Sequence, residues 1–189
     1  MIETIFPKSL VILDNILDPA TLNNIFEATE NVLNMGTDRS PLLNVDSTAL
    51  TTNNLQDNPL FDALTIIIHR ECQNYMKHLG YSSDQISNRN ITKMWANHSA
   101  TNDYLFPHVH PESCLSGAFY ITTPENSEIV FFDSIDSTFP EPACPNSINH
   151  TTVNISCKNN RLLIFKSNLL HATTGQLNNN KIVLSFNYN

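Results

Sequence analysis

The stretch FPHVHPESCLSGAFYIT (residues 106–122) places two histidines directly before a strongly apolar segment. His108 and His110 are separated by one residue, and side chains at positions i and i+2 of an extended chain point to the same face. A third histidine, His171, ends the apolar stretch RLLIFKSNLLH, and Lys181 follows it in the next apolar segment. Three imidazoles from two neighbouring strands can therefore converge on one metal ion, with a cation close by.

Short apolar segments separated by turn residues fill the second half of the chain around these histidines. The candidate strands are 91–97, 116–122, 128–133, 151–157, 161–166 and 181–187. Turn-forming runs such as Pro124-Glu125-Asn126 separate them. Many short strands separated by turn residues are typical of a β-sandwich or a β-barrel.

The first half of the chain predicts two helices. Asp18 and Pro19 suit the N-cap and the first position of a helix that extends to about Met35. A second helix is expected over 59–79 and a short strand over 4–14. The polar residues 36–57 are expected to form a long loop, which is often a lid or a wall of a binding site and would help to choose a substrate. The fold class is therefore mainly β with α, a jelly roll flanked by N-terminal helices. We expect one domain over 1–189, with helical support over about 1–90 and the jelly-roll core over about 91–189.

Composition narrows the class of function and of partner. The formal net charge is −8 over 189 residues and no basic stripe is visible, so a nucleic-acid partner is not expected. No apolar run reaches the ~20 residues of a membrane span, and the N-terminus lacks the features of a signal peptide. The four scattered cysteines form no CxxC pair, which favours reduced thiols and a cytoplasmic location.

Three motifs in order resemble a known family. HVHPESCLSGAFYI (108–121), RLLIFKSNLLHATTG (161–175) and KIVLSFNYN (181–189) are similar to the HxHP, LSG, strand-end histidine and SFN motifs of a group of 2-oxoglutarate/Fe(II)-dependent oxygenases. This group is common in marine bacteria and in phages of cyanobacteria, so the host cytoplasm is the expected location if a phage encodes the chain. The resemblance implies a double-stranded β-helix, the cupin-like form of the jelly roll.

The resemblance also implies a cofactor and a reaction. It implies Fe(II), 2-oxoglutarate as co-substrate and O2 as oxidant, giving succinate, CO2 and a hydroxylated product. His108 and His171 correspond to metal ligands, and His110 stands where related enzymes carry a carboxylate ligand. The metal would then be held by three histidines. In an alternative reading, Glu112 supplies a carboxylate ligand.

Lys181 stands where the family usually has an arginine that binds the distal carboxylate of 2-oxoglutarate. A lysine offers a point charge in place of a bidentate fork. Val183 occupies a position where related oxygenases often carry a serine. Ser185 and Asn187 share the Lys181 face by strand alternation. Together with Tyr120 and Asn97, they are the remaining expected polar contacts to the co-substrate.

Two alternatives from other classes remain open at the level of sequence. A cupin-like metalloenzyme could use three histidines without 2-oxoglutarate, although it would need no lysine to anchor a keto acid. A non-catalytic jelly-roll binding protein is also compatible with the fold. No sequence feature specifies the primary substrate or the oligomeric state.

Overall fold

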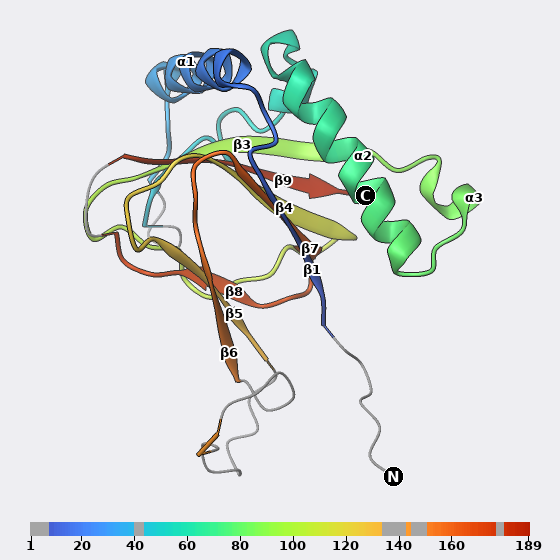
Figure 1. Cartoon of the computed structure of the whole chain (residues 1–189). Helices are drawn as coiled ribbons and strands as arrows, with labels where there is room; N and C mark the ends of the chain where they lie inside the picture. The colour runs from blue at the N-terminus through green and yellow to red at the C-terminus, as the bar shows by residue number, and fades with distance from the viewer. Residues whose placement is uncertain (1–7, 40–43, 134–142, 145–150, 177–179) are drawn as a thin grey trace.

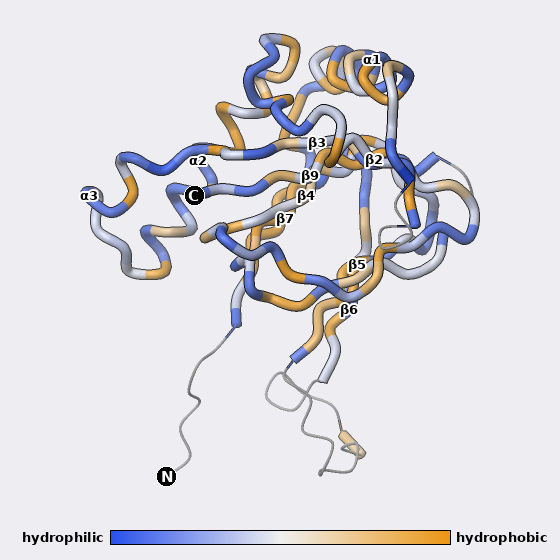
Figure 2. Tube along the Cα trace, turned by 180° about the vertical axis from the view of Figure 1, so that it is seen from behind, coloured by the Kyte–Doolittle hydropathy of each residue, from blue (hydrophilic) through white to orange (hydrophobic). Residues whose placement is uncertain are grey.

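Two antiparallel sheets pack face to face in the computed structural model, which describes residues 8–39, 44–133, 143–144, 151–176 and 180–189 (Figure 1). In spatial order, the larger sheet contains β1 (Leu10–Asp14), β7 (Arg161–Lys166), β4 (Leu115–Thr122), β9 (Lys181–Tyr188), β3 (Ile91–Ser99) and β2 (Asp46–Ser47). The smaller sheet contains β6 (Thr152–Ser156), β5 (Glu128–Phe132) and β8 (His171–Thr173). Figure 2 views the arrangement from behind, with the smaller sheet below the larger one. The predicted jelly roll is confirmed.

Helices cover the outer face of the larger sheet. The long ones are α1 (Pro19–Met35) and α2 (Asp62–His78), and the short ones are η1 (Leu55–Asp57), η2 (Pro59–Phe61) and α3 (Ser83–Ile86). Helix α1 begins where the sequence predicts, because the Asp18 carboxylate accepts hydrogen bonds from the backbone N–H groups of Ala20 and Thr21. None of the helices among the described residues combines the length and hydrophobicity that crossing a bilayer requires.

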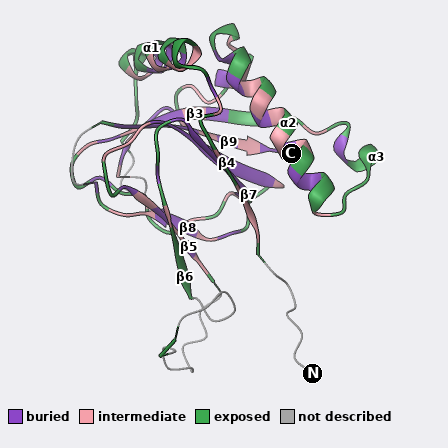
Figure 3. Cartoon of the chain, viewed as in Figure 1, coloured by how far each residue is buried: buried purple, intermediate pink, exposed green. Residues whose placement is uncertain are grey.

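Strand alternation sorts the side chains of the larger sheet into two clusters. On β9, Ile182, Leu184 and Phe186 pack with the helices in the main core. The intervening residues Lys181 and Val183 point to the opposite face, toward the smaller sheet. Figure 3 shows β4 and β9 as largely buried, whereas β6 at the edge of the smaller sheet is exposed. The helices thus close one face of the sheet and leave the other for a site.

Three parts of the fold differ from the sequence prediction. Strands β2 and β8 and helix α3 were not predicted, because two to four residues are too few to show a period. The predicted loop 36–57 contains β2, which pairs with β3, and the 3-10 turn η1. The structure does not describe residues 40–43 of that loop. It also does not describe residues 4–7 of the predicted strand 4–14.

Gly117 lies in the centre of β4, where the sheet leaves no room for a side chain. A Cβ atom at Gly117 would lie 2.3 Å from the carbonyl oxygen of Leu163 and 2.3 Å from Cζ of Phe186. We expect Gly117→Ala to lower the free energy of unfolding by about 3 kcal/mol, because backbone and a packed ring must both move. Urea unfolding of the variant measures this. Gly175→Ala is the matched control, since a Cβ atom at that position would have no neighbour within 4 Å; equal stability of the two variants would contradict the prediction.

Candidate metal centre

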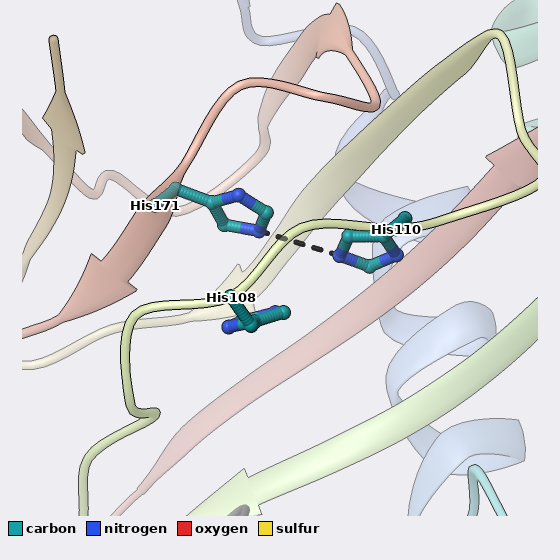
Figure 4. Close-up of side chains that lie close together, drawn as sticks. All are labelled: His108, His110 and His171. Carbon is teal, nitrogen blue, oxygen red and sulfur yellow. Dashed lines mark hydrogen bonds between the residues drawn. The ribbon is translucent and has the colours of Figure 1, made fainter. Parts of the chain in front are cut away.

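The three histidines meet where the segment before β4 runs alongside β8. The backbone N–H of His108 donates to the carbonyl oxygen of His171 at 2.9 Å, and the reciprocal hydrogen bond measures 3.1 Å. The backbone N–H of His110 donates to the carbonyl oxygen of Ser167 at 2.9 Å. This pairing brings one potential ligand atom from each of His108, His110 and His171 within 4.8 Å of the others (Figure 4). The convergence expected from the sequence is present, although His108 and His110 lie in an extended loop and not in a regular strand.

Each imidazole is held at Nδ1 by an oxygen atom. Nδ1 of His108 lies 2.7 Å from the carbonyl oxygen of Phe106, and Nδ1 of His171 lies 2.8 Å from that of Leu169. Nδ1 of His110 lies 2.8 Å from Oδ1 of Asn187. Because these oxygens accept hydrogen bonds, each Nδ1 carries the proton and each Nε2 keeps a lone pair. Metal-binding histidines in proteins are oriented by outer partners of this kind.

Burial keeps two of the rings uncharged at neutral pH. Burial and the neighbouring His108 lower the pKa of His110 to about 4 and that of His171 to about 3. The Nε2 atoms of these two rings are 3.3 Å apart. Two lone pairs at this distance repel each other unless a proton or a metal ion lies between them. Because protonation is disfavoured, a metal cation suits the site better.

The spacing fits one transition-metal ion bound on one face. Ligand atoms at adjacent corners of an octahedral site, with metal–nitrogen bonds of about 2.1 Å, lie roughly 3 Å apart. The Nε2 atoms of His110 and His171, 3.3 Å apart, are close to this spacing, and the potential ligand atom of His108 lies within 4.8 Å of the other two. Imidazole is a common ligand of iron. Among the described residues the three histidines are the one group of three or more histidine, cysteine or acidic side chains close enough to share an ion. Glu112, the alternative carboxylate ligand, is exposed in a turn and does not belong to this group.

A cavity of about 210 Å³ extends from the histidines between the two sheets. This volume is below the ~300–1,000 Å³ of sites for drug-sized ligands, so it suits a small metabolite. Strand β3 contributes Trp95, Asn97 and Ser99, strand β4 contributes Tyr120, and strand β9 contributes Lys181, Val183 and Ser185, with other residues. Apart from the histidines, Lys181 is the single charged side chain among the described residues that line the cavity.

The Lys181 ammonium is buried, and no oxygen or nitrogen atom of the described residues accepts a hydrogen bond from it. The residue is 2 % exposed, and the Cys157 thiol is the one described group that favours its charged form. Nζ lies 5.6 Å from the centroid of the Tyr120 ring. Burial lowers the pKa of Lys181, while the Cys157 thiol acts in the opposite direction. A thiol is a weak acceptor and does not replace the hydration that a buried ammonium loses, so the arrangement is suited to an anion that enters the cavity.

The other residues expected to contact the co-substrate divide into two groups. Tyr120, Asn97 and Ser185 line the cavity, as expected. The amide of Asn97 is already bonded, since Oδ1 accepts from Ser47 at 2.6 Å and Nδ2 donates to Ser185 at 3.0 Å. Asn187 does not line the cavity, because its Oδ1 is turned to the His110 ring.

Sequence reasoning missed several contacts of the site. The Trp95 ring stacks on His110 with a centroid distance of 5.8 Å and an angle of 27°. Ser116 and Ser167 form a buried hydroxyl pair at 2.8 Å next to Asn187. The Cys157 thiol, in the loop directly after β6, interacts with Lys181 at the start of β9. The LSG motif contains Ser116, but no spacing rule links it to residues of later strands.

A family model described as "Putative 2OG-Fe(II) oxygenase" matches residues 93–187, which include all three histidines and Lys181. The chain belongs to this family of 2-oxoglutarate- and Fe(II)-dependent oxygenases. It is therefore a non-haem iron dioxygenase that uses Fe(II), 2-oxoglutarate and O2. No curated protein sequence matches the chain significantly. The family match favours the oxygenase over a cupin-like enzyme without 2-oxoglutarate and over a non-catalytic binding protein.

Solved structures share the fold at low sequence identity. A viral collagen prolyl hydroxylase from Paramecium bursaria Chlorella virus-1, in complex with 2-oxoglutarate, has a TM-score of 0.60 at 15% identity, covering 95% of this chain and 94% of that one. A prolyl-4-hydroxylase from Pseudomonas putida has a TM-score of 0.63 at 7% identity, with 95% and 92% coverage. HygX from Streptomyces hygroscopicus, with nickel and 2-oxoglutarate bound, has a TM-score of 0.62 at 10% identity, with 96% and 82% coverage.

Proposed function

We propose that the chain hydroxylates a C–H bond of its primary substrate, with Fe(II) held by His108, His110 and His171 and 2-oxoglutarate anchored by Lys181. One observation carries the proposal. The same cavity contains three imidazoles, each with a potential ligand atom within 4.8 Å of the others, and a buried ammonium that no carboxylate of the cavity lining neutralises. A metal ion and a dicarboxylate are the two ligands that these groups would satisfy.

The histidines would leave the opposite face of the ion open. His108, His110 and His171 would hold the ion with three ligands and leave other positions free for small ligands such as the co-substrate. Iron supplies the chemistry of O2 activation when it is bound. The chain's own residues hold the rings in place through their Nδ1 hydrogen bonds and shield the site with Trp95 and Phe165, whose rings contact His110 and His171.

Lys181 would pair with the carboxylate of the co-substrate that the metal ion does not bind. Neutral histidines do not reduce the positive charge of the ion, and the described lining of the cavity contains no carboxylate. The two carboxylates of 2-oxoglutarate would therefore meet the ion at one end and Lys181 at the other. Tyr120 lies beside Lys181 and is uncharged, because burial raises its pKa well above the usual value.

The primary substrate would approach on the His108 side. His108 is partly exposed, whereas His171 is 5 % exposed. Two loops flank this side and are joined by an ion pair between Arg39 and the buried Asp103. Ala49 of the first loop and Leu105 of the second line the cavity. This supports the expectation that the 36–57 loop helps to choose the substrate.

Conversion of 2-oxoglutarate to succinate tests the proposal. Protein incubated with Fe(II), 2-oxoglutarate, O2 and ascorbate is expected to release succinate and CO2 slowly even before a primary substrate is known, because ascorbate supplies the two electrons that the substrate C–H bond would otherwise give. His108→Ala should lower the rate at least about 100-fold, because a direct metal ligand is lost. Val109→Ala is the control, since this exposed side chain lies between the two histidines but outside the metal group. Equal succinate release by His108→Ala and the parent protein would disprove the assignment.

A further inference from the structure

The three histidines are not held in the same way. His108 and His171 each donate from Nδ1 to the backbone carbonyl of the residue two positions earlier. A carbonyl can only accept, so the backbone alone fixes the proton on Nδ1 in both rings. His110 instead depends on the side-chain amide of Asn187, which comes from β9 and is 77 positions away in the sequence.

A side-chain amide can present either its oxygen or its nitrogen. With the oxygen toward His110, the ring carries its proton on Nδ1 and the lone pair on Nε2 faces the metal site. With the nitrogen toward His110, the amide would donate to Nδ1, the proton would move to Nε2, and the ring could not bind a metal ion. The orientation of Asn187 therefore decides whether His110 is a competent ligand.

Two buried serines complete a chain of hydrogen bonds behind Asn187. Ser116 Oγ lies 3.0 Å from Oδ1 of Asn187, and Ser167 Oγ lies 2.8 Å from Ser116 Oγ. When Ser116 donates to the amide oxygen, Ser167 donates to Ser116, so both hydroxyls support the orientation that His110 needs. Both serines are fully buried, at 0 % and 1 % exposed, so water does not compete for these bonds.

Ser167 is connected to His110 by a second route. Its carbonyl oxygen accepts the backbone N–H of His110 at 2.9 Å, while its hydroxyl pairs with Ser116. The main chain of His110 and the partner of its ring are thus fixed by the same short segment after β7. The Trp95 ring on the other side restricts rotation of the imidazole.

We infer that Asn187, oriented by Ser116 and Ser167, is a positioning residue that keeps His110 in its metal-binding tautomer. The inference rests on the proposed function, in which His110 is a ligand. It assigns Asn187 to the metal centre in place of the co-substrate. It also gives a reason for both the serine of the LSG motif and the asparagine of the SFN motif in this chain.

Metal binding without turnover tests the inference. Co(II) binding is measured by calorimetry without oxygen, and the histidine tautomers of the metal-free protein are read by nitrogen-15 NMR. Asn187→Leu is expected to lower Co(II) affinity about 10- to 100-fold and to move the His110 proton toward Nε2.

Three further variants test the hydrogen bonds separately. Asn187→Asp keeps an acceptor and should retain affinity for Co(II). Ser116→Ala should reduce affinity less than Asn187→Leu. Thr92→Val is the control, since its exposed hydroxyl meets only the backbone oxygen of Asn187, at 3.4 Å.

The outcomes separate this inference from the proposed function. Unchanged Co(II) affinity and an unchanged His110 tautomer in Asn187→Leu would overturn the role of Asn187. If His110→Ala still loses affinity in that case, the three-histidine site stands and only the present inference falls. If His110→Ala also binds Co(II) normally, His110 is not a ligand and both fall. If Asn187→Leu does not fold, the affinities of Ser116→Ala and Asn187→Asp for Co(II) are compared instead. A reduced affinity of the same size in both variants would overturn the inference, because the aspartate still offers His110 an acceptor.

Discussion

Replacement of His171 by alanine is expected to abolish tight metal binding, with a loss of affinity for Co(II) of more than about 100-fold. Removal of an outer partner of a ligand typically costs 10- to 100-fold, and loss of the ligand itself must cost more. His171 is the central member of the group. Its Nε2 lies 3.3 Å from that of His110, and its ring centroid lies 4.3 Å from that of His108. Anaerobic calorimetry with Co(II) measures the effect.

A matched variant separates metal binding from a general effect of removing an imidazole. His78→Ala removes an exposed histidine at the end of α2 and should bind Co(II) as the parent protein does. His171→Ala also removes a buried side chain, so circular dichroism must show that the fold is retained. A folded His171→Ala protein with unchanged Co(II) affinity would exclude the three-histidine site.

The long strands of the larger sheet were predictable because they have enough residues to show alternation. Strand β9 has eight residues and β3 has nine, so a full pattern of core and cavity positions is present in each. The start of α1 was equally clear, because Asp18 and Pro19 suit the cap and the first turn. In contrast, β8 has three residues and begins at His171. Its pairing with β5 and its bridge to His108 depend on tertiary contacts, which no local pattern reports.

The sequence was sufficient to predict which residues form the candidate site, but not which hydrogen bonds connect them. The i, i+2 spacing of His108 and His110 and the position of His171 were enough to predict convergence. The sequence also placed Lys181 and Asn187 on one face of a strand, which is correct. It could not show that the Asn187 oxygen is taken by His110, because that contact depends on a loop that crosses the end of β9. Strand alternation gives the direction of a side chain but not its partner.

Lysine in place of arginine at position 181 should be visible in the pH dependence of co-substrate binding. Burial lowers the pKa of Lys181 in the protein without co-substrate. The carboxylate of 2-oxoglutarate binds the protonated ammonium, so affinity is fully present below this pKa and falls as the pH rises through it. Because the pKa lies below 10.5, the loss begins at a lower pH than for an ordinary lysine. An arginine stays protonated, so Lys181→Arg should show no such loss.

Replacement of Lys181 by methionine should weaken 2-oxoglutarate binding about 10- to 100-fold, because a hydrogen bond to a charged group contributes about 1.5–3 kcal/mol. Calorimetry of 2-oxoglutarate with the Co(II)-loaded protein, repeated across a pH series, measures both the affinity and its slope. Lys166→Met is the control, since Lys166 is exposed on β7 and does not line the cavity. Lys181→Met should lose both the affinity for 2-oxoglutarate and its dependence on pH, because both depend on the protonated Lys181 ammonium. Parent-like binding or a retained slope in Lys181→Met would show that the anion is held elsewhere.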